Sequence, residues 1–151
     1  MAKTKSNMLE LGTKAPNFQL IDSITNKNVS YAEAKGKFGT VVMFICNHCP
    51  YVKHLLNVIN IVSKEYQNKE INFVAISSND VLNYPEDSPE LMKETAITQN
   101  FSFPYLYDES QEVAKKYDAA CTPDFYLFNT KDLLVYRGQI DESRPGNNLP
   151  S

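Results

Sequence analysis

The chain has no tryptophan, three cysteines and five glycines among its 151 residues. Three cysteines are too few for the disulfide scaffolds that stabilise small secreted domains. No stretch approaches the 18 consecutive apolar residues of a membrane-spanning helix. The first ten residues carry charge but lack the apolar run of a signal peptide. We therefore expect a cytoplasmic globular protein that does not associate with a membrane.

Charge and motif content exclude further classes of function. The 15 basic and 18 acidic side chains give a net charge of −3, without the basic patch that nucleic-acid binding requires. The chain also lacks the G-x-G-x-x-G, Walker and G-x-S-x-G motifs that bind dinucleotides and nucleotides or present a catalytic serine. We expect no organic cofactor, no bound metal and no nucleic-acid partner.

The apolar pattern predicts an α/β domain over residues 11–151, preceded by a flexible arm at 1–10. The run VVMFI suits a strand buried on both faces of a sheet. Strands that alternate with helices indicate a sheet covered by helices on both sides. The predicted elements are a hairpin within 18–29, strands at 41–45, 71–77 and 104–108, helices at 50–67, 89–99 and 110–117, and a hairpin of 124–129 with 133–138.

The residues of greatest chemical interest stand between the strand at 41–45 and the helix at 50–67. They are Cys46, Asn47, His48, Cys49 and Pro50. A cysteine at the beginning of a helix is stabilised as thiolate by unpaired amide groups and by the helix dipole. Protonated His48 would add positive charge, and Pro50 suits the first helical turn. We predict Cys46 as the nucleophile and Cys49 as its disulfide partner, with Asn47, His48 and Pro50 supporting them.

The third cysteine belongs to a second motif, Cys121-Thr122-Pro123, which directly precedes the strand at 124–129. Two interpretations of Cys121 stay open. It is either a packed thiol at the beginning of a strand or a third redox thiol close to Cys46.

A strand, C-x-x-C-P and a helix, followed by Thr-Pro before the last hairpin, resemble the thioredoxin superfamily. The segments GTKAPNFQL, FICNHCPYVKH, YPEDSPE, PYLYDESQEVAKKYDAACTPDFYLF and LVYRGQIDESRPGN are similar to bacterial thioredoxin-like proteins of the alkyl hydroperoxide reductase and thiol-specific antioxidant (AhpC/TSA) type. The resemblance covers about residues 11–147. It implies a thioredoxin-like fold, which has a mixed central sheet, helices on both faces and, in this type, an N-terminal β-hairpin extension.

The same resemblance assigns roles to residues. It implies that Cys46 and Cys49 are the redox pair, and that Thr122-Pro123 is a cis-proline peptide that faces the pair and binds a substrate strand. Many thioredoxins also bury an acidic residue in the strand below the site, but TVVMFI has none, so His48 or a carboxylate from elsewhere would serve. The family's C-terminal helix has no counterpart in IDESRPGNNLPS. We expect an uncovered apolar strip there, which would promote a homodimer.

We therefore predict a thiol-disulfide oxidoreductase that acts on protein or small-molecule disulfides and is served by a thiol reductant. One alternative is a thiol peroxidase or antioxidant protein, although Val42 and Cys46 replace the Pro and Thr of the peroxiredoxin signature P-x-x-x-T-x-x-C. Another is a copper- or zinc-binding protein whose ligands are Cys46, His48 and Cys49 with His54 or Cys121.

Overall fold

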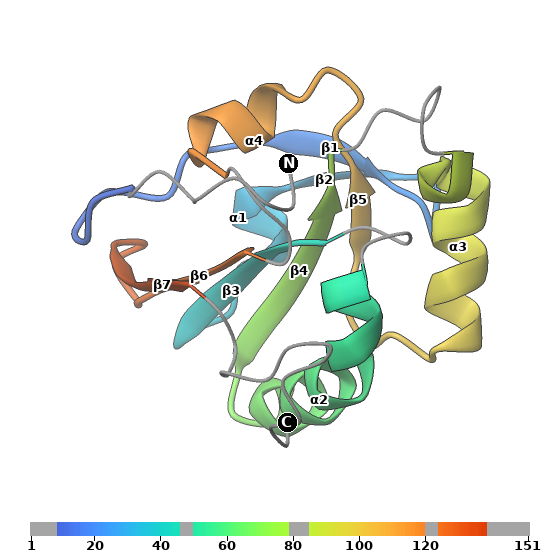
Figure 1. The fold of residues 1–151 in the computed structure, drawn as a ribbon. Coiled ribbons are helices and arrows are strands. Elements are labelled where there is room, and N and C mark those ends of the chain that lie inside the picture. Colours follow the sequence, from blue (N-terminus) through green and yellow to red (C-terminus); the bar gives the residue numbers. More distant parts are fainter. Residues whose placement is uncertain (1–8, 46–49, 79–84, 120–123, 139–151) are drawn as a thin grey trace.

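The computed structural model describes residues 9–45, 50–78, 85–119 and 124–138; for 50–56 and 86 it describes the backbone alone. A seven-stranded sheet forms the centre, in the order β2-β1-β5-β4-β3-β6-β7 (Figure 1). Its strands are β1 (Gln19–Asp22), β2 (Asn28–Ser30), β3 (Gly39–Phe44), β4 (Ile71–Ser77), β5 (Tyr105–Tyr107), β6 (Asp124–Phe128) and β7 (Leu134–Gly138). The helices are α1 (Tyr31–Ala34), α2 (Pro50–Gln67), the 3₁₀ turn η1 (Pro85–Asp87), α3 (Pro89–Thr98) and α4 (Glu112–Lys116).

The sheet is mixed, as the sequence predicts. Strands β3, β4 and β5 run parallel, whereas β1 is antiparallel to both β2 and β5. Strand β6 is antiparallel to β3 and forms the final hairpin with β7. This confirms the α/β architecture and the N-terminal β-hairpin.

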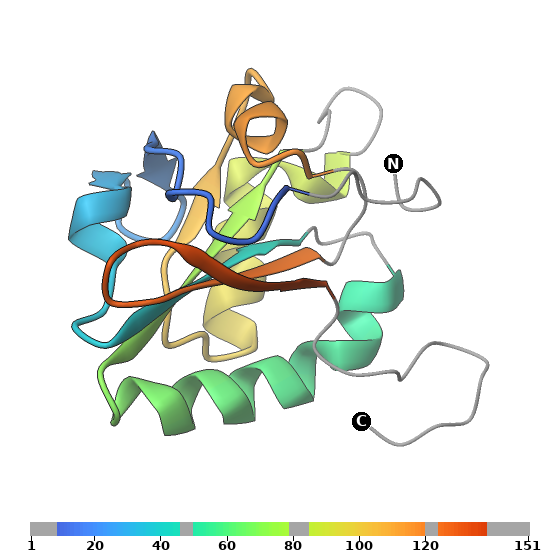
Figure 2. The same cartoon turned by 90° about the vertical axis from the view of Figure 1, so that its left-hand side faces the viewer.

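Each face of the sheet carries its own hydrophobic core, because successive residues of a strand point to opposite faces. Val42 packs into the core that includes residues of α1 and α4, whereas the next residue, Met43, packs into the core with residues of α2 and α3. Both side chains are fully buried. Figures 1 and 2 show α2 on one side of the sheet and α4 on the other.

The predicted helix at 89–99 is confirmed as α3, but its buried face is narrower than predicted. Ser88 caps it by accepting a hydrogen bond from the Leu91 amide. Met92 and Ala96 are buried, whereas Leu91 and Ile97 are 39% and 64% exposed. The prediction that Leu91 and Ile97 point inward was wrong, because α3 contacts the core through side chains one turn apart rather than through a broad stripe.

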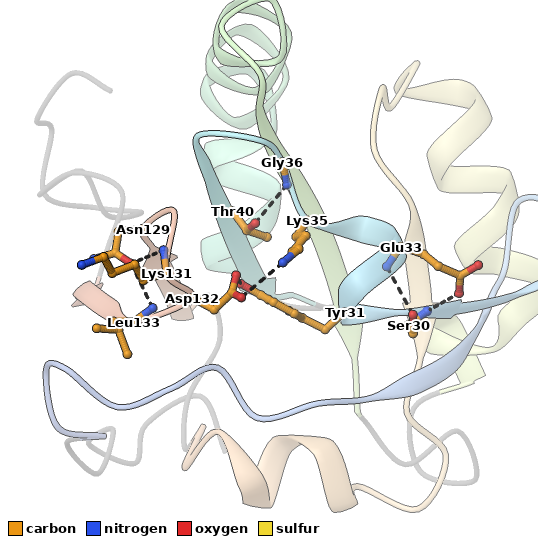
Figure 3. A network of polar contacts seen from close by, with 10 residues as sticks. All are labelled: Ser30, Tyr31, Glu33, Lys35, Gly36, Thr40, Asn129, Lys131, Asp132 and Leu133. Carbon is orange, nitrogen blue, oxygen red and sulfur yellow. Dashed lines mark hydrogen bonds and ion pairs between the residues drawn. The ribbon is translucent and has the colours of Figure 1, made fainter.

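Short helices account for the other differences. The sequence pattern missed α1 and η1, which have four and three residues, too few to show a helical period. Helix α1 is defined by its capping box, in which Ser30 Oγ accepts from the Glu33 amide and Glu33 Oε1 accepts from the Ser30 amide (Figure 3). Helix α4 begins at Glu112, two residues after the predicted start, since Gln111 has a φ of 65°.

An apolar groove of about 330 Å³ lies between α2 and strands β3, β4, β6 and β7. The side chains that line it are Val41, Val62, Tyr66, Ile71, Phe73, Phe125, Leu127 and Tyr136. It occurs beside α2, where the sequence predicts an uncovered strip. Self-association through this strip stays a prediction, and residues 139–151 lie outside the described part of the chain.

Candidate active site

The candidate site lies at the sheet edge where β3, β4 and β5 end and β6 begins. Phe44, the last residue of β3, is the register partner of Ile76 in β4 and of Asp124 in β6. Beyond it, the Ile45 amide donates to the Ile76 carbonyl at 3.0 Å. This edge is therefore tied together across three adjacent strands.

Both chemically interesting segments of the sequence adjoin this register pair. Cys46, Asn47, His48 and Cys49 follow Ile45 and lie outside the described residues. Cys121, Thr122 and Pro123 also lie outside them, and immediately precede Asp124. The structure thus fixes the points from which the two segments depart, because Phe44 and Asp124 are opposite each other.

Helix α2 contributes a positive electrostatic potential at the same edge. Its backbone begins at Pro50, as predicted, and continues for 18 residues. The unpaired amide groups and aligned peptide dipoles of a helix give its N-terminus about half a positive charge. The first turn of α2 contains no acidic residue that would offset this charge. An anion that precedes Pro50 is therefore stabilised.

Asp124 brings a buried carboxylate to the site. Its side chain is 2% exposed and its Oδ2 accepts a hydrogen bond from the Tyr126 hydroxyl at 3.0 Å. Arg137 of β7, whose side chain is 5% exposed, places Nη2 at 3.5 Å from the same oxygen. The Arg137 guanidinium also lies 5.5 Å from the centre of the Tyr126 ring. A negative and a positive charge are thus buried side by side at the beginning of the last hairpin.

An aromatic cluster surrounds this charge pair. The rings of Phe44, Tyr117 and Tyr126 contact one another with centroids 5.5–5.8 Å apart. Burial raises the pKa of Tyr126 well above its usual value, and the negative charge of Asp124 raises it further. Burial likewise raises the pKa of Tyr117. Both phenols are therefore neutral at physiological pH.

A second buried carboxylate, Asp108, follows β5 at the same edge. Its Oδ2 accepts hydrogen bonds from Ser78 Oγ at 2.8 Å and from the Ala114 amide at 3.0 Å. Gln111 Nε2 donates to the Ser78 carbonyl at 2.8 Å. These contacts fasten the first turn of α4 to the ends of β4 and β5, and so support the edge from which the predicted redox segment departs.

The sequence profile of the AhpC/TSA family matches residues 11–137. The chain belongs to the AhpC/TSA family. A solved structure of an uncharacterised conserved protein from Geobacillus kaustophilus is 53% identical, with a TM-score of 0.96, over 98% of this chain and 78% of that one.

Two relatives with named activities are less similar to this AhpC/TSA-family protein. The thiol-disulfide oxidoreductase ResA of Bacillus thuringiensis is 24% identical over 87% of this chain and 71% of its own length. The thioredoxin domain of a thiol-disulfide oxidoreductase from Bacteroides vulgatus has a TM-score of 0.73 at 18% identity, and covers 87% of this chain and 90% of that domain. The first supports an oxidoreductase activity, and the second a thioredoxin-like fold.

Sequence reasoning missed Asp124, Tyr126 and Arg137 as members of the site. A signal was present, because Asp124 follows Thr-Pro at the beginning of a predicted strand and Arg137 lies in the strand that returns beside it. Arg137 is the register partner of Tyr126, and is therefore diagonal to Asp124 on one face of the hairpin, within reach of a long side chain.

The described residues test neither the metal-binding alternative nor the third thiol. Within 9–45, 50–78, 85–119 and 124–138, no group of three or more His, Cys, Asp or Glu side chains could hold a metal. The cysteines and His48 proposed as ligands lie outside these ranges, and of His54 only the backbone is described. In the same ranges no helix is both long enough and apolar enough to span a bilayer.

Proposed function

We propose that the protein is a thiol-disulfide oxidoreductase in which Cys46 and Cys49 are the redox pair. The observation that carries the proposal is the register pair Phe44–Asp124. It brings the chain that leads into Cys46 next to the chain that leaves Pro123. The similarity to ResA, which is named a thiol-disulfide oxidoreductase, supports the same chemistry.

The reaction proceeds by two thiolate attacks. The Cys46 thiolate attacks one sulfur of a substrate disulfide, forms a mixed disulfide and releases the other substrate sulfur as thiolate. The Cys49 thiolate then attacks Cys46 Sγ, forms the Cys46–Cys49 disulfide and releases the second substrate thiolate. Two electrons pass from the protein to the substrate, and an external thiol reductant restores the dithiol.

The described residues support this reaction in two ways. The N-terminus of α2, with no acidic residue in its first turn, favours a thiolate immediately before Pro50. Thr122 and Pro123 directly precede an antiparallel strand at the same edge, where an extended substrate segment can bind. The substrate in this proposal is a disulfide in a protein or a small molecule, and the compartment is the cytoplasm.

Reduction of insulin disulfides by the full chain, with dithiothreitol as reductant, tests the proposal. Cys46→Ser should abolish turnover, and Cys49→Ser should accumulate a mixed disulfide that mass spectrometry detects. Cys121→Ser reports on the third thiol, because retained turnover would exclude an obligatory role for it.

The competing functions give different results in the same samples. Peroxide consumption that persists in Cys46→Ser and is lost in Cys49→Ser would indicate a thiol peroxidase. One equivalent of copper or zinc retained through dialysis, without turnover of insulin, would indicate a metal-binding protein. Either result would overturn the proposed function.

A further inference from the structure

One face of the sheet lacks a covering helix beside α2. Helix α2 contacts β4 and helix α3 contacts β5, and both pack into the core to which Met43 belongs. On this face, no helix of the described residues covers the outer strands β6 and β7 (Figures 1 and 2). The apolar groove of about 330 Å³ lies there, between α2 and the final hairpin. The described part of the protein therefore presents a hollow apolar surface toward the β7 edge of its sheet.

Exposed apolar side chains border this groove as well as line it. On the side of α2 it is lined by Val62 and Tyr66. At about 100° per residue, Ile61 lies next to Val62 on the outward side of the helix, and it is 67% exposed. On the side of the hairpin, Tyr136 lines the groove and is 48% exposed. A hollow and exposed apolar side chains thus lie side by side, which is typical of a surface that binds a partner.

Charged side chains of both signs stand at the border of the groove. Glu65 lies one helical turn after Ile61, on the same side of α2. Lys69 follows the last turn of α2, and its Nζ lies 5.0 Å from the centre of the Tyr66 ring. Both charged side chains are exposed, and in the part of the chain that the structure describes neither forms an ion pair. The groove is therefore bordered by one negative and one positive charge that lack a partner of opposite sign within those residues.

Such a surface fits a second copy of itself. In a two-fold interface both subunits use the same patch, so the patch must be complementary to itself. The exposed Ile61 of one copy can enter the groove of the other, and Glu65 can meet Lys69 of the other. An acidic or a basic partner would leave one of these charges without a complement, and a small apolar ligand would leave both of them exposed. The net charge of −3 adds only weak repulsion between two copies at physiological ionic strength.

We propose that the protein forms a two-fold symmetric homodimer through the face made by α2 and the β6–β7 hairpin. The groove and Ile61 form the apolar centre of the interface, and Glu65 and Lys69 form its charged border. The proposal goes beyond the proposed function, since none of these residues takes part in thiol exchange.

Sedimentation equilibrium of the full chain, with dithiothreitol present to prevent intermolecular disulfides, measures the dimer. The wild-type protein should show a reversible equilibrium between monomer and dimer. Ile61→Glu should raise the dissociation constant at least about 100-fold, because each dimer loses two apolar side chains from its interface. The matched control is Ile97→Glu on α3, since Ile97 is 64% exposed and does not line the groove. We expect no change in the control, and circular dichroism verifies that both variants are folded.

Two charge variants test the symmetry of the interface. Glu65→Lys leaves only positive charge at the border of the groove, and Lys69→Glu leaves only negative charge. Each variant alone should dimerise roughly tenfold more weakly than the wild-type protein, because like charges then face each other. An equimolar mixture should recover the wild-type affinity, since the positive border of one variant meets the negative border of the other. High salt should reduce these differences.

Several results would overturn the proposal. They are a strictly monomeric wild-type protein at high concentration, a dimer that Ile61→Glu and Ile97→Glu weaken equally, and a mixture of the charge variants that recovers no affinity. A monomer that dimerises only after removal of residues 139–151 would assign the groove to that segment. A monomer that retains a small molecule in native mass spectrometry, and loses it in Ile61→Glu, would assign the groove to a ligand. Either assignment would also overturn the proposal.

Discussion

The buried pair of Asp124 and Arg137 allows a quantitative prediction of the free energy of unfolding. At 3.5 Å and an effective dielectric constant of about 20, the attraction between the two charges is about 5 kcal/mol. Desolvation offsets much of this attraction in the intact protein. Removing one partner, however, leaves an uncompensated buried charge, which costs about 3–5 kcal/mol. The long contact between Asp124 and Arg137 places the expected loss near 3 kcal/mol for either single variant.

A double-mutant cycle separates this coupling from the general cost of substitution. Asp124→Asn and Arg137→Gln together should lose clearly less than about 3 kcal/mol, rather than the sum of about 6, because the second substitution removes the charge that the first left unpaired. Since the chain has no tryptophan, urea unfolding is best followed by far-UV circular dichroism.

An additive double variant would refute this reasoning, because it would show that the two charges do not interact in the folded protein. The exposed pair Lys35–Asp132, with side chains 42% and 20% exposed, provides the comparison. Its cycle should yield a coupling of at most about 1 kcal/mol, as is usual for exposed pairs.

Three further predictions concern other parts of the molecule. The free energy of unfolding should be highest below pH 10 and fall as pH rises above it, by up to about 4 kcal/mol per pH unit. The reason is that burial raises the pKa of three tyrosines above the unfolded value of about 10. Urea unfolding at pH 9–11 measures this fall, and Tyr117→Phe should make it about a third less steep. The tyrosines are Tyr31, Tyr117 and Tyr126. Gly36→Ala should lower the unfolding free energy by about 1–3 kcal/mol, because a Cβ atom there would lie only 2.5 Å from backbone oxygens of Gly39 and Glu70. A urea-unfolding midpoint equal to that of the wild-type protein would contradict this close approach. If the groove beside α2 promotes self-association, light scattering should show dimers at high concentration, whereas a strictly monomeric species would exclude it.

Helix α2 and strand β4 could be predicted because each shows its pattern of apolar residues over many positions. Helix α2 shows its apolar stripe over 18 residues, and β4 contains an apolar run at 73–76 that is bounded by Asn72 and Ser77. The final hairpin was also predicted correctly, since the turn at TKD separates two apolar runs. Helix α1 was missed because it depends on one local pair of hydrogen bonds between Ser30 and Glu33, and not on a period.

The site could be predicted only as far as local motifs define it. The placement of Cys46 and Cys49 between a strand and a helix is visible in the sequence, and the structure confirms the strand and the helix on either side. The Asp124–Arg137 pair could not be predicted in this way. It depends on the register of β6 against both β3 and β7, which is a property of the assembled sheet. Asp124 is a buried carboxylate in the strand next to β3.

The most direct test of the central claim is the reduction potential of the Cys46/Cys49 couple, titrated against glutathione with mass spectrometry of the quenched protein. We predict one reversible disulfide between these two residues, with a potential between about −270 and −120 mV, the range of thioredoxin-fold dithiols. If no Cys46–Cys49 disulfide forms anywhere in that range while the protein remains folded, the account is wrong.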